Sequence, residues 1–251
     1  MGTLLATLIG LYLAACLLLF AFERKLLFFP SDEVSVEGVA HIVLDSGEVR
    51  LKVWTLNPGR ERALLYFGGN AENVANNIAA FDTLFPGHTV YLLNYRGYGG
   101  SSGTPGEEGF YRDAELLYTY ASRRHRAVSV MGRSIGSAVA THLAANRQVE
   151  KLVLVTPFDS AVGVAKRLYP IFPVGILMRD RFESAQQAGA ITAPTLVVVA
   201  TEDGIIPPEN AQRLIEALSA ATTEVVTLSE VDHNTIHLHP AYGSVVSQFL
   251  R

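Results

Sequence analysis

The chain has 251 residues, 49% of them hydrophobic, which is the size of one α/β domain. Its formal net charge of −4 is small, so the composition indicates no nucleic-acid partner. The single cysteine, Cys16, excludes an internal disulfide and a cysteine-based metal site, and the seven histidines show no metal-ligand spacing, so we expect no metal and no cofactor.

The N-terminal stretch is typical of a membrane span. Residues 2–22 carry no charge and are dominated by Leu, Ala and Ile. As a helix they would extend about 31 Å, which matches a hydrocarbon core of roughly 30 Å. A cleaved signal peptide is the main alternative, but no basic segment precedes the run and no A-x-A site ends it. The run L-A-A-C at 13–16 resembles a lipoprotein processing box, but the apolar run continues past Cys16.

We therefore expect a single-pass transmembrane anchor with an interfacial linker over residues 1–30, and the lipid bilayer as a partner. Arg24 and Lys25 follow the span, and the positive-inside rule would place the following domain in the cytoplasm. Two charges are too few to fix the side. Gly2 and Gly10 do not form a G-x-x-x-G face, so a homodimer through the anchor has no positive signal and stays open.

Residues 31–251 have the pattern of an α/β domain. Alternating apolar residues over 34–56 predict an antiparallel hairpin at the sheet edge. Strands then alternate with helices, which predicts a mostly parallel sheet with helices on both faces. The expected strands are 63–67, 89–93, 128–131, 151–155, 194–200 and 224–228, and the expected helices are 71–84, 108–123, 137–145, 208–218 and 240–250.

Residues 158–188 interrupt this alternation, and residues 169–178 within them are apolar and contain two prolines. We interpret the segment as a short cap over the site. Phe172, Ile176 and Leu177 are its candidate substrate-binding residues, since they could line an acyl pocket. A surface helix packed on the sheet is the alternative, because no clear period decides between the two.

The most informative stretch is G-R-S-I-G at 132–136. It lies between a short β-branched strand and a helix of small residues, and it matches the G-x-S-x-G nucleophile elbow. Ser134 must occupy a strained turn so that its hydroxyl stands clear of the backbone. Gly132 and Gly136 lack the Cβ atoms that would clash where strand meets helix. Gly-rich turns follow many parallel strands, so this motif alone does not identify a catalytic serine. Residues elsewhere in the chain have to supply the partners of Ser134.

A serine hydroxyl becomes nucleophilic only when a base takes its proton, and an acid must orient that base. Asp203 comes just after the strand that ends at Ala200, and His233 follows the strand that ends at Leu228. The carboxyl ends of parallel strands meet at one sheet edge, so both residues are expected near Ser134. The competing acids are Glu202, Asp232 and Asp159, and the competing bases are His237 and His239.

An oxyanion hole needs two backbone N–H groups directed at the developing charge. The first candidate is the amide of Ile135, which follows the nucleophile. The second comes from the loop after Phe67, where we favour the Asn70 amide and place Gly69 behind it.

These residues together resemble the membrane-anchored α/β-hydrolases of the ABHD and Bem46-like type, within the serine hydrolase superfamily. The similarity covers nearly the whole chain. The matching segments are Leu27–Pro30, Tyr66–Asn73, Asn94–Gly99, Gly132–Gly136, Thr156–Ser160, Asp203–Pro207 and Asp232–Asn234. The resemblance implies an α/β-hydrolase fold with Ser134 as nucleophile, Asp203 as acid and His233 as base. Where the family usually has His-Gly-Asn in the oxyanion loop, this chain has Gly68 in place of the histidine, which is normally structural.

We therefore expect a serine hydrolase fixed to a membrane that cleaves esters or thioesters, of lipid or acyl-chain substrates, through an acyl-enzyme. Proximity to the bilayer supports the lipid part of this expectation, and pocket chemistry does not. A peptidase or amidase on the same triad and a non-catalytic membrane scaffold are the alternatives.

Overall fold

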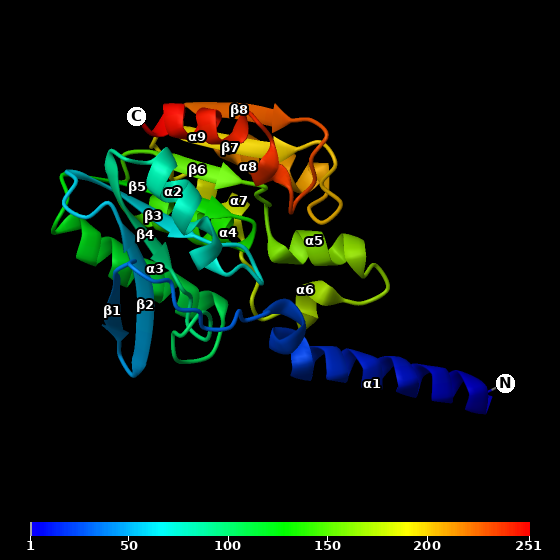
Figure 1. Cartoon of the computed structure of the whole chain (residues 1–251). Coiled ribbons are helices and arrows are strands. Elements are labelled where there is room, and N and C mark those ends of the chain that lie inside the picture. Colours follow the sequence, from blue (N-terminus) through cyan, green and yellow to red (C-terminus); the bar gives the residue numbers. More distant parts are fainter. Residues whose placement is uncertain (1) are drawn as a thin grey trace.

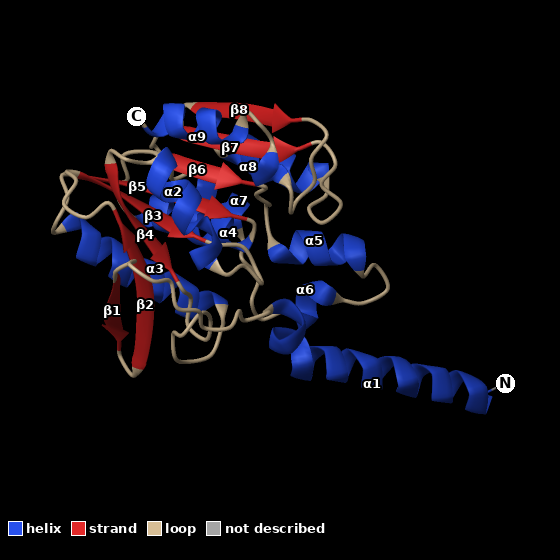
Figure 2. Ribbon diagram, in the orientation of Figure 1, coloured by secondary structure: helices blue, strands red, loops and turns tan. Residues whose placement is uncertain are grey.

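The computed structural model describes residues 2–251, whose strands form one eight-stranded sheet between two layers of helices (Figures 1 and 2). The strand order is β1-β2-β4-β3-β5-β6-β7-β8. β2 pairs antiparallel with β1 and β4, and all other pairs are parallel. This confirms the predicted fold class. The strands are β1 His41–Ser46, β2 Val49–Leu56, β3 Arg62–Phe67, β4 His88–Leu93, β5 Ala127–Arg133, β6 Leu152–Val155, β7 Thr195–Ala200 and β8 Thr223–Leu228.

Both faces of the sheet are covered because successive strand residues point to opposite sides. Leu65 and Val130 belong to one buried core, whereas Tyr66 and Met131 belong to the other. The first core also contains residues of α3 Glu107–Ser122, α4 Ile135–Asn146, α7 Ser184–Ala188 and α8 Pro208–Ala217. The second contains residues of the 3-10 turn η1 Val74–Asn77, of α2 Ile78–Leu84, of a second 3-10 turn η2 Ile236–Leu238, and of α9 Tyr242–Leu250.

The helix expected over residues 71–84 is wrong at its start. The α-helix α2 begins only at Ile78, after the η1 turn. The side chain of Asn73 accepts a hydrogen bond from the Ala75 amide at 3.1 Å, and the Glu72 amide donates to the Gly69 carbonyl. These bonds favour a loop and a tight turn over an immediate α-helix. The residues after β3 therefore form a loop at the carboxyl edge of the sheet.

Helix α1, Gly2–Leu27, projects away from the sheet domain (Figure 1). It is long and apolar enough to cross a membrane by length and composition. Its C-terminal end is held by charged groups. The buried carboxylate of Glu23 accepts hydrogen bonds from the Arg179 amide at 2.7 Å and the Asp180 amide at 3.0 Å, and Arg24 Nε donates to Asp180 Oδ2 at 2.8 Å. The end of α1 is thus fixed to the segment that contains residues 179 and 180.

That segment lies between β6 and β7. It contains the short helices α5 Ala161–Leu168 and α6 Val174–Leu177 ahead of α7. In Figure 1, α5 and α6 lie outside the main stack of elements, between the sheet domain and α1.

Close approach of β5, α4 and β3 positions the turn that holds Ser134. A Cβ atom on Gly132 would overlap the Gly136 carbonyl oxygen, and one on Gly136 would overlap the Phe67 carbonyl oxygen. Both overlaps involve backbone atoms, which cannot rotate away. The start of α4 can therefore lie against the end of β3 only with glycine at these two positions.

We expect Gly136→Ala to destabilise the protein by about 3 kcal/mol, despite the better helix propensity of alanine, because backbone must move to admit the methyl group. The matched control is Gly87→Ala, where an added Cβ meets nothing within 4 Å. Chemical denaturation of both variants in detergent measures the difference. Equal stabilities for the two variants would contradict this view of the turn.

Candidate active site

Ser134 occupies the sharp turn between β5 and α4. Its backbone has φ 52° and ψ −120°, a left-handed conformation that is strained for a residue with a Cβ atom. The Ser134 amide donates to the Val155 carbonyl at 2.9 Å, which holds the turn to the end of β6. The strain and the glycines on either side are the features expected of a nucleophile elbow.

His233 and Asp203 lie at the same edge of the sheet, after β8 and β7 respectively. His233 Nε2 is 2.9 Å from Ser134 Oγ, and His233 Nδ1 is 2.8 Å from Asp203 Oδ2. The other carboxylate oxygen, Asp203 Oδ1, accepts hydrogen bonds from the amides of Ile205 at 3.0 Å and Ile206 at 2.7 Å. The structure therefore brings together the three residues singled out in the sequence, with the imidazole between hydroxyl and carboxylate.

The competing residues have other partners or lie in solvent. Asp159 Oδ2 accepts from Arg213 Nε at 2.6 Å. The Asp232 carboxylate accepts hydrogen bonds from the amides of Thr235 and Asn234. These bonds lower the pKa of the carboxyl group and fix the loop after His233. His239 Nδ1 accepts from the Ala241 amide at 3.1 Å, and Glu202 and His237 are exposed.

The loop after β3 passes close to Ser134. A Cβ built on Gly69 would lie 3.6 Å from the Cβ of Ser134. However, the Gly69 amide already donates to Glu72 Oε2 at 2.7 Å, so in this conformation it is engaged within its own loop. Of the three oxyanion candidates, the Ile135 amide at the start of α4 and the Asn70 amide stay as the expected pair.

The side chain of Asn70 joins this loop to the end of the N-terminal helix. Its Nδ2 donates to the Leu27 carbonyl at 2.6 Å. Its Oδ1 accepts from the Phe29 amide at 3.1 Å and from the Tyr98 hydroxyl at 2.9 Å. The segment that follows α1 is therefore hydrogen-bonded directly to the loop beside Ser134.

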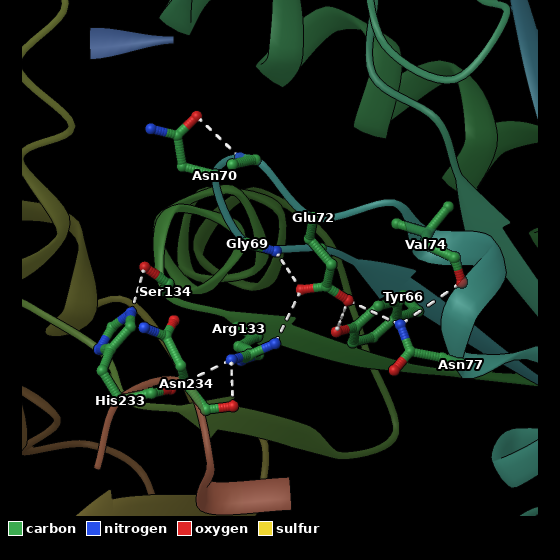
Figure 3. Close-up of polar contacts among 12 residues, drawn as sticks. Tyr66, Gly69, Asn70, Glu72, Val74, Asn77, Arg133, Ser134, His233 and Asn234 are labelled. Atoms are coloured by element: carbon green, nitrogen blue, oxygen red, sulfur yellow. Dashed lines mark hydrogen bonds and ion pairs between the residues drawn. The ribbon is translucent and has the colours of Figure 1, made fainter. Parts of the chain in front are cut away.

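Sequence reasoning missed an ion pair under the site, between Glu72 and Arg133 (Figure 3). Arg133 Nη1 is 3.3 Å from Glu72 Oε2, and both side chains are at most 15% exposed. Arg133 Nη2 donates to the carbonyls of His233 at 3.1 Å and Asn234 at 3.3 Å. One guanidinium thus contacts both the loop after β3 and the loop that carries His233, and it belongs to the residue before Ser134.

The other Glu72 oxygen, Oε1, accepts from Tyr66 Oη at 2.7 Å and from Asn77 Nδ2 at 2.6 Å (Figure 3). Burial, and then the negative charge of Glu72, raise the pKa of Tyr66 well above its usual value, so this hydroxyl stays a donor. The signal in the sequence was the presence of Glu72 and Arg133 within otherwise uncharged glycine-rich stretches, but their pairing depends on the fold.

A cavity of about 560 Å³ opens at Ser134 and His233. Phe29 and Ile205 supply its apolar lining, and the loop at 69–72 forms one wall. Of the three residues expected to line an acyl pocket, the structure brings none to this cavity. Phe172 stacks on Tyr12 of α1, with ring centroids 5.9 Å apart, and Ile176 is 82% exposed. Leu177 lies beside Ile176 in α6, away from the cavity lining. The segment that carries these three residues contacts α1 and does not line the cavity. No local pattern in the sequence indicates that contact, so the prediction for these residues is wrong.

Side chains that could bind a metal ion do not form a cluster in the part of the chain that the structure describes. Within residues 2–251, no three His, Cys, Asp or Glu side chains lie together in a group that could hold a metal ion.

Residues 62–173 match the family model described as "alpha/beta hydrolase fold". An uncharacterized protein of Mycobacterium tuberculosis strain H37Rv is 31% identical over 227 residues, which cover 84% of this chain and 80% of the relative. Protein bem46 of Schizosaccharomyces pombe is 28% identical over 223 residues, 83% of this chain and 73% of bem46. An uncharacterized membrane protein of Saccharomyces cerevisiae is 24% identical over 220 residues, 83% of this chain and 78% of the relative.

Two solved structures show the same fold at low sequence identity. The esterase Pf2001 of Pyrococcus furiosus superposes with a TM-score of 0.70 at 16% identity, covering 88% of this chain and 98% of the esterase. A thioesterase domain from the curacin biosynthetic pathway superposes with a TM-score of 0.65 at 14% identity, covering 85% of this chain and 99% of that domain.

The Glu72–Arg133 pair yields a stability prediction. Glu72→Gln removes the charge that balances a buried guanidinium, and we expect a loss of about 3 kcal/mol in unfolding free energy. The matched control is Glu115→Gln, which breaks the exposed pair with Arg147 and is expected to cost less than about 1 kcal/mol. Denaturant unfolding of both variants decides the matter, and a Glu72→Gln protein as stable as the control would show that the pair does not hold these loops.

Proposed function

Because this chain belongs to the α/β-hydrolase fold family, in its ABHD and Bem46-like branch, we propose that it is a serine hydrolase that cleaves carboxylic esters or thioesters. The observation that carries the proposal is the continuous hydrogen-bond chain from Ser134 Oγ through the His233 imidazole to Asp203, at the wall of a cavity. The esterase and thioesterase neighbours share the fold and are compatible with this chemistry.

The proposed acylation step uses this arrangement of the three side chains. His233 Nε2 takes the proton of Ser134 Oγ as the oxygen attacks the substrate carbonyl carbon. The amides of Ile135 and Asn70 donate to the oxyanion that forms. His233 then gives its proton to the leaving alkoxide or thiolate, and an acyl group stays on Ser134.

Deacylation repeats the same steps with water. His233 accepts a proton from water, whose oxygen attacks the acyl carbonyl, and then returns the proton to Ser134 as the acid departs. Asp203 keeps the imidazole in the tautomer with Nδ1 protonated and stabilises the imidazolium. The two amides on Asp203 Oδ1 hold the carboxylate in the orientation this role requires.

The position of the cavity supports a lipid or acyl-chain substrate. Phe29 contributes to its lining, and this residue follows α1 by two positions. If α1 spans a bilayer, the cavity opens close to the membrane surface, where an acyl chain need travel only a short way to reach Ser134. The apolar side chains of Phe29 and Ile205 suit such a chain better than a charged one.

The N-terminal helix supports attachment to a membrane. It is long and apolar enough to cross one, and the yeast relative is described as a membrane protein. We propose a single-pass anchor, with the side of the catalytic domain left open.

The test is fluorophosphonate labelling and nitrophenyl ester hydrolysis by the detergent-solubilised full chain, beside Ser134→Ala. We expect the wild type to label and turn over, and Ser134→Ala to lose labelling and at least about 10³-fold of the rate. Ser137→Ala is the matched control, because its hydroxyl donates to the Ser134 carbonyl, away from His233.

The alternatives give different outcomes. Faster cleavage of peptide amides than of nitrophenyl esters would favour a peptidase or amidase on the same three residues. A folded wild type that neither labels nor turns over any ester would contradict the proposal and favour a membrane scaffold.

A further inference from the structure

The cap contacts the N-terminal helix between Tyr12 and its C-terminal end, and Figure 1 shows α6 next to the end of α1 that is nearest the sheet domain. Close to the domain, Arg179 Nη2 donates to the Phe20 carbonyl at 3.3 Å, and its guanidinium lies 5.0 Å from the Phe20 ring centroid. Farther along, the Tyr12 hydroxyl donates to the Ile171 carbonyl at 2.8 Å, and the Tyr12 ring stacks on Phe172. The cap is therefore joined to α1 at two separated points.

The position of Tyr12 along α1 places the cap residues that contact it near the middle of the proposed membrane span. The charges at the end of α1 begin at Glu23, and Tyr12 lies eleven residues before it. At 1.5 Å per residue this separation is about 16 Å, which is roughly half of a 30 Å hydrocarbon core. A helix tilt of 40° would still leave Tyr12 about 12 Å below the level of Glu23. If α1 spans a bilayer, the chain around Ile171 must lie below the headgroups.

The composition of this part of the cap suits that location. Residues 168–178, which we call the cap tip, contain no charged side chain. Ile171 is 72% exposed and Ile176 is 82% exposed, and Leu168 and Tyr169 are each more than half exposed. Large apolar side chains gathered at a protein's edge mark an interaction surface. Basic residues flank the tip: Lys166 and Arg167 on one side and Arg179 on the other.

We propose that the cap tip is inserted into the same membrane leaflet as the C-terminal half of α1, with its apolar side chains against lipid acyl chains. The bilayer is the occupant that the structure favours because the tip continues the exposed apolar surface of α1 itself. Lys166 can extend its ammonium group toward the headgroups, while Arg179 is paired with Glu23 at the end of α1. This inference rests on the proposed membrane anchor, and it adds a second segment of the chain to the membrane-bound surface.

One consequence concerns the site. The same cap segment, through Asp180, binds Arg24 and the Glu107 amide at the start of α3. The anchor, the cap and the sheet domain are thus joined at one point, so insertion of the tip fixes the orientation of the Ser134 cavity relative to the lipid surface.

The test is site-directed fluorescence in the full chain, reconstituted in phosphatidylcholine vesicles. In a Cys16→Ala background, single cysteines replace Ile171 in the tip, Leu8 in α1 and Val225 on β8, and each is labelled with an environment-sensitive fluorophore. Leu8 and Val225 are matched controls because both are exposed in the structure, one on the span and one on the sheet domain. We expect blue-shifted emission and quenching by chain-brominated lipids at positions 171 and 8, and quenching by aqueous iodide at position 225.

Lipid quenching at position 8 with iodide quenching at position 171 would overturn the proposal while leaving the anchor intact. Iodide quenching at both positions would overturn the proposal and the anchor together. Fluorophosphonate labelling of the same samples reports on Ser134 independently, so failure of the catalytic proposal is distinguishable from either result.

A second measurement uses Ile171→Asp with Ile171→Leu as its control. A carboxylate placed below the headgroups opposes insertion, so we expect Ile171→Asp to hydrolyse a vesicle-borne long-chain ester about tenfold more slowly than Ile171→Leu. Both variants should hydrolyse a short water-soluble ester in detergent at the same rate. Equal rates on the vesicle-borne ester would contradict insertion of the tip.

Discussion

The guanidinium of Arg133 connects the parts of the site that the chain supplies from distant positions. It belongs to the residue before Ser134, pairs with Glu72 in the loop after β3, and donates to the backbone of the loop that carries His233. A buried charge is costly unless it is paired. Loss of any one of these contacts would therefore leave part of the guanidinium without a partner and destabilise the fold around Ser134. The relative positions of Ser134, His233 and the loop after β3 therefore depend in part on the contacts of this one guanidinium.

The same loop joins the site to the end of the N-terminal helix. Asn70 contributes its backbone amide to the proposed oxyanion hole, while its side chain binds the chain at Leu27 and Phe29. The end of α1 is in turn fixed to the cap by Glu23 and Arg24. The C-terminal end of α1 is thus part of the packing around the cavity. A domain cut free after residue 30 would lose these contacts as well as the apolar helix.

The fold and the grouping of the three candidate catalytic residues could be predicted because they follow from local patterns and one topological rule. Ser134, Asp203 and His233 each come just after an apolar strand, and parallel strands bring their carboxyl ends to one edge. The fold prediction is confirmed. The catalytic roles of these residues stay predictions, with a geometry that suits them.

What the sequence could not predict depends on side-chain direction and long-range contacts. Nothing local indicates that Glu72 turns back to occupy the Gly69 amide, or that the helix expected from residue 71 is delayed to Ile78. The cap residues Phe172 and Ile176 have the composition of an acyl pocket, but the contacts of the cap with α1 hold them away from the cavity. Apolar composition alone does not distinguish a side chain that lines a cavity from one that packs on another helix or lies on the surface.

The most direct measurement of the central claim is the detection of the acyl-enzyme. The full chain is mixed with a long-chain nitrophenyl ester, quenched in acid within the first turnovers, and its peptides are analysed by mass spectrometry. The account predicts one acyl adduct, on the peptide that contains Ser134, and none in His233→Ala. Ester turnover without an adduct on Ser134, or with the adduct on another residue, would contradict it.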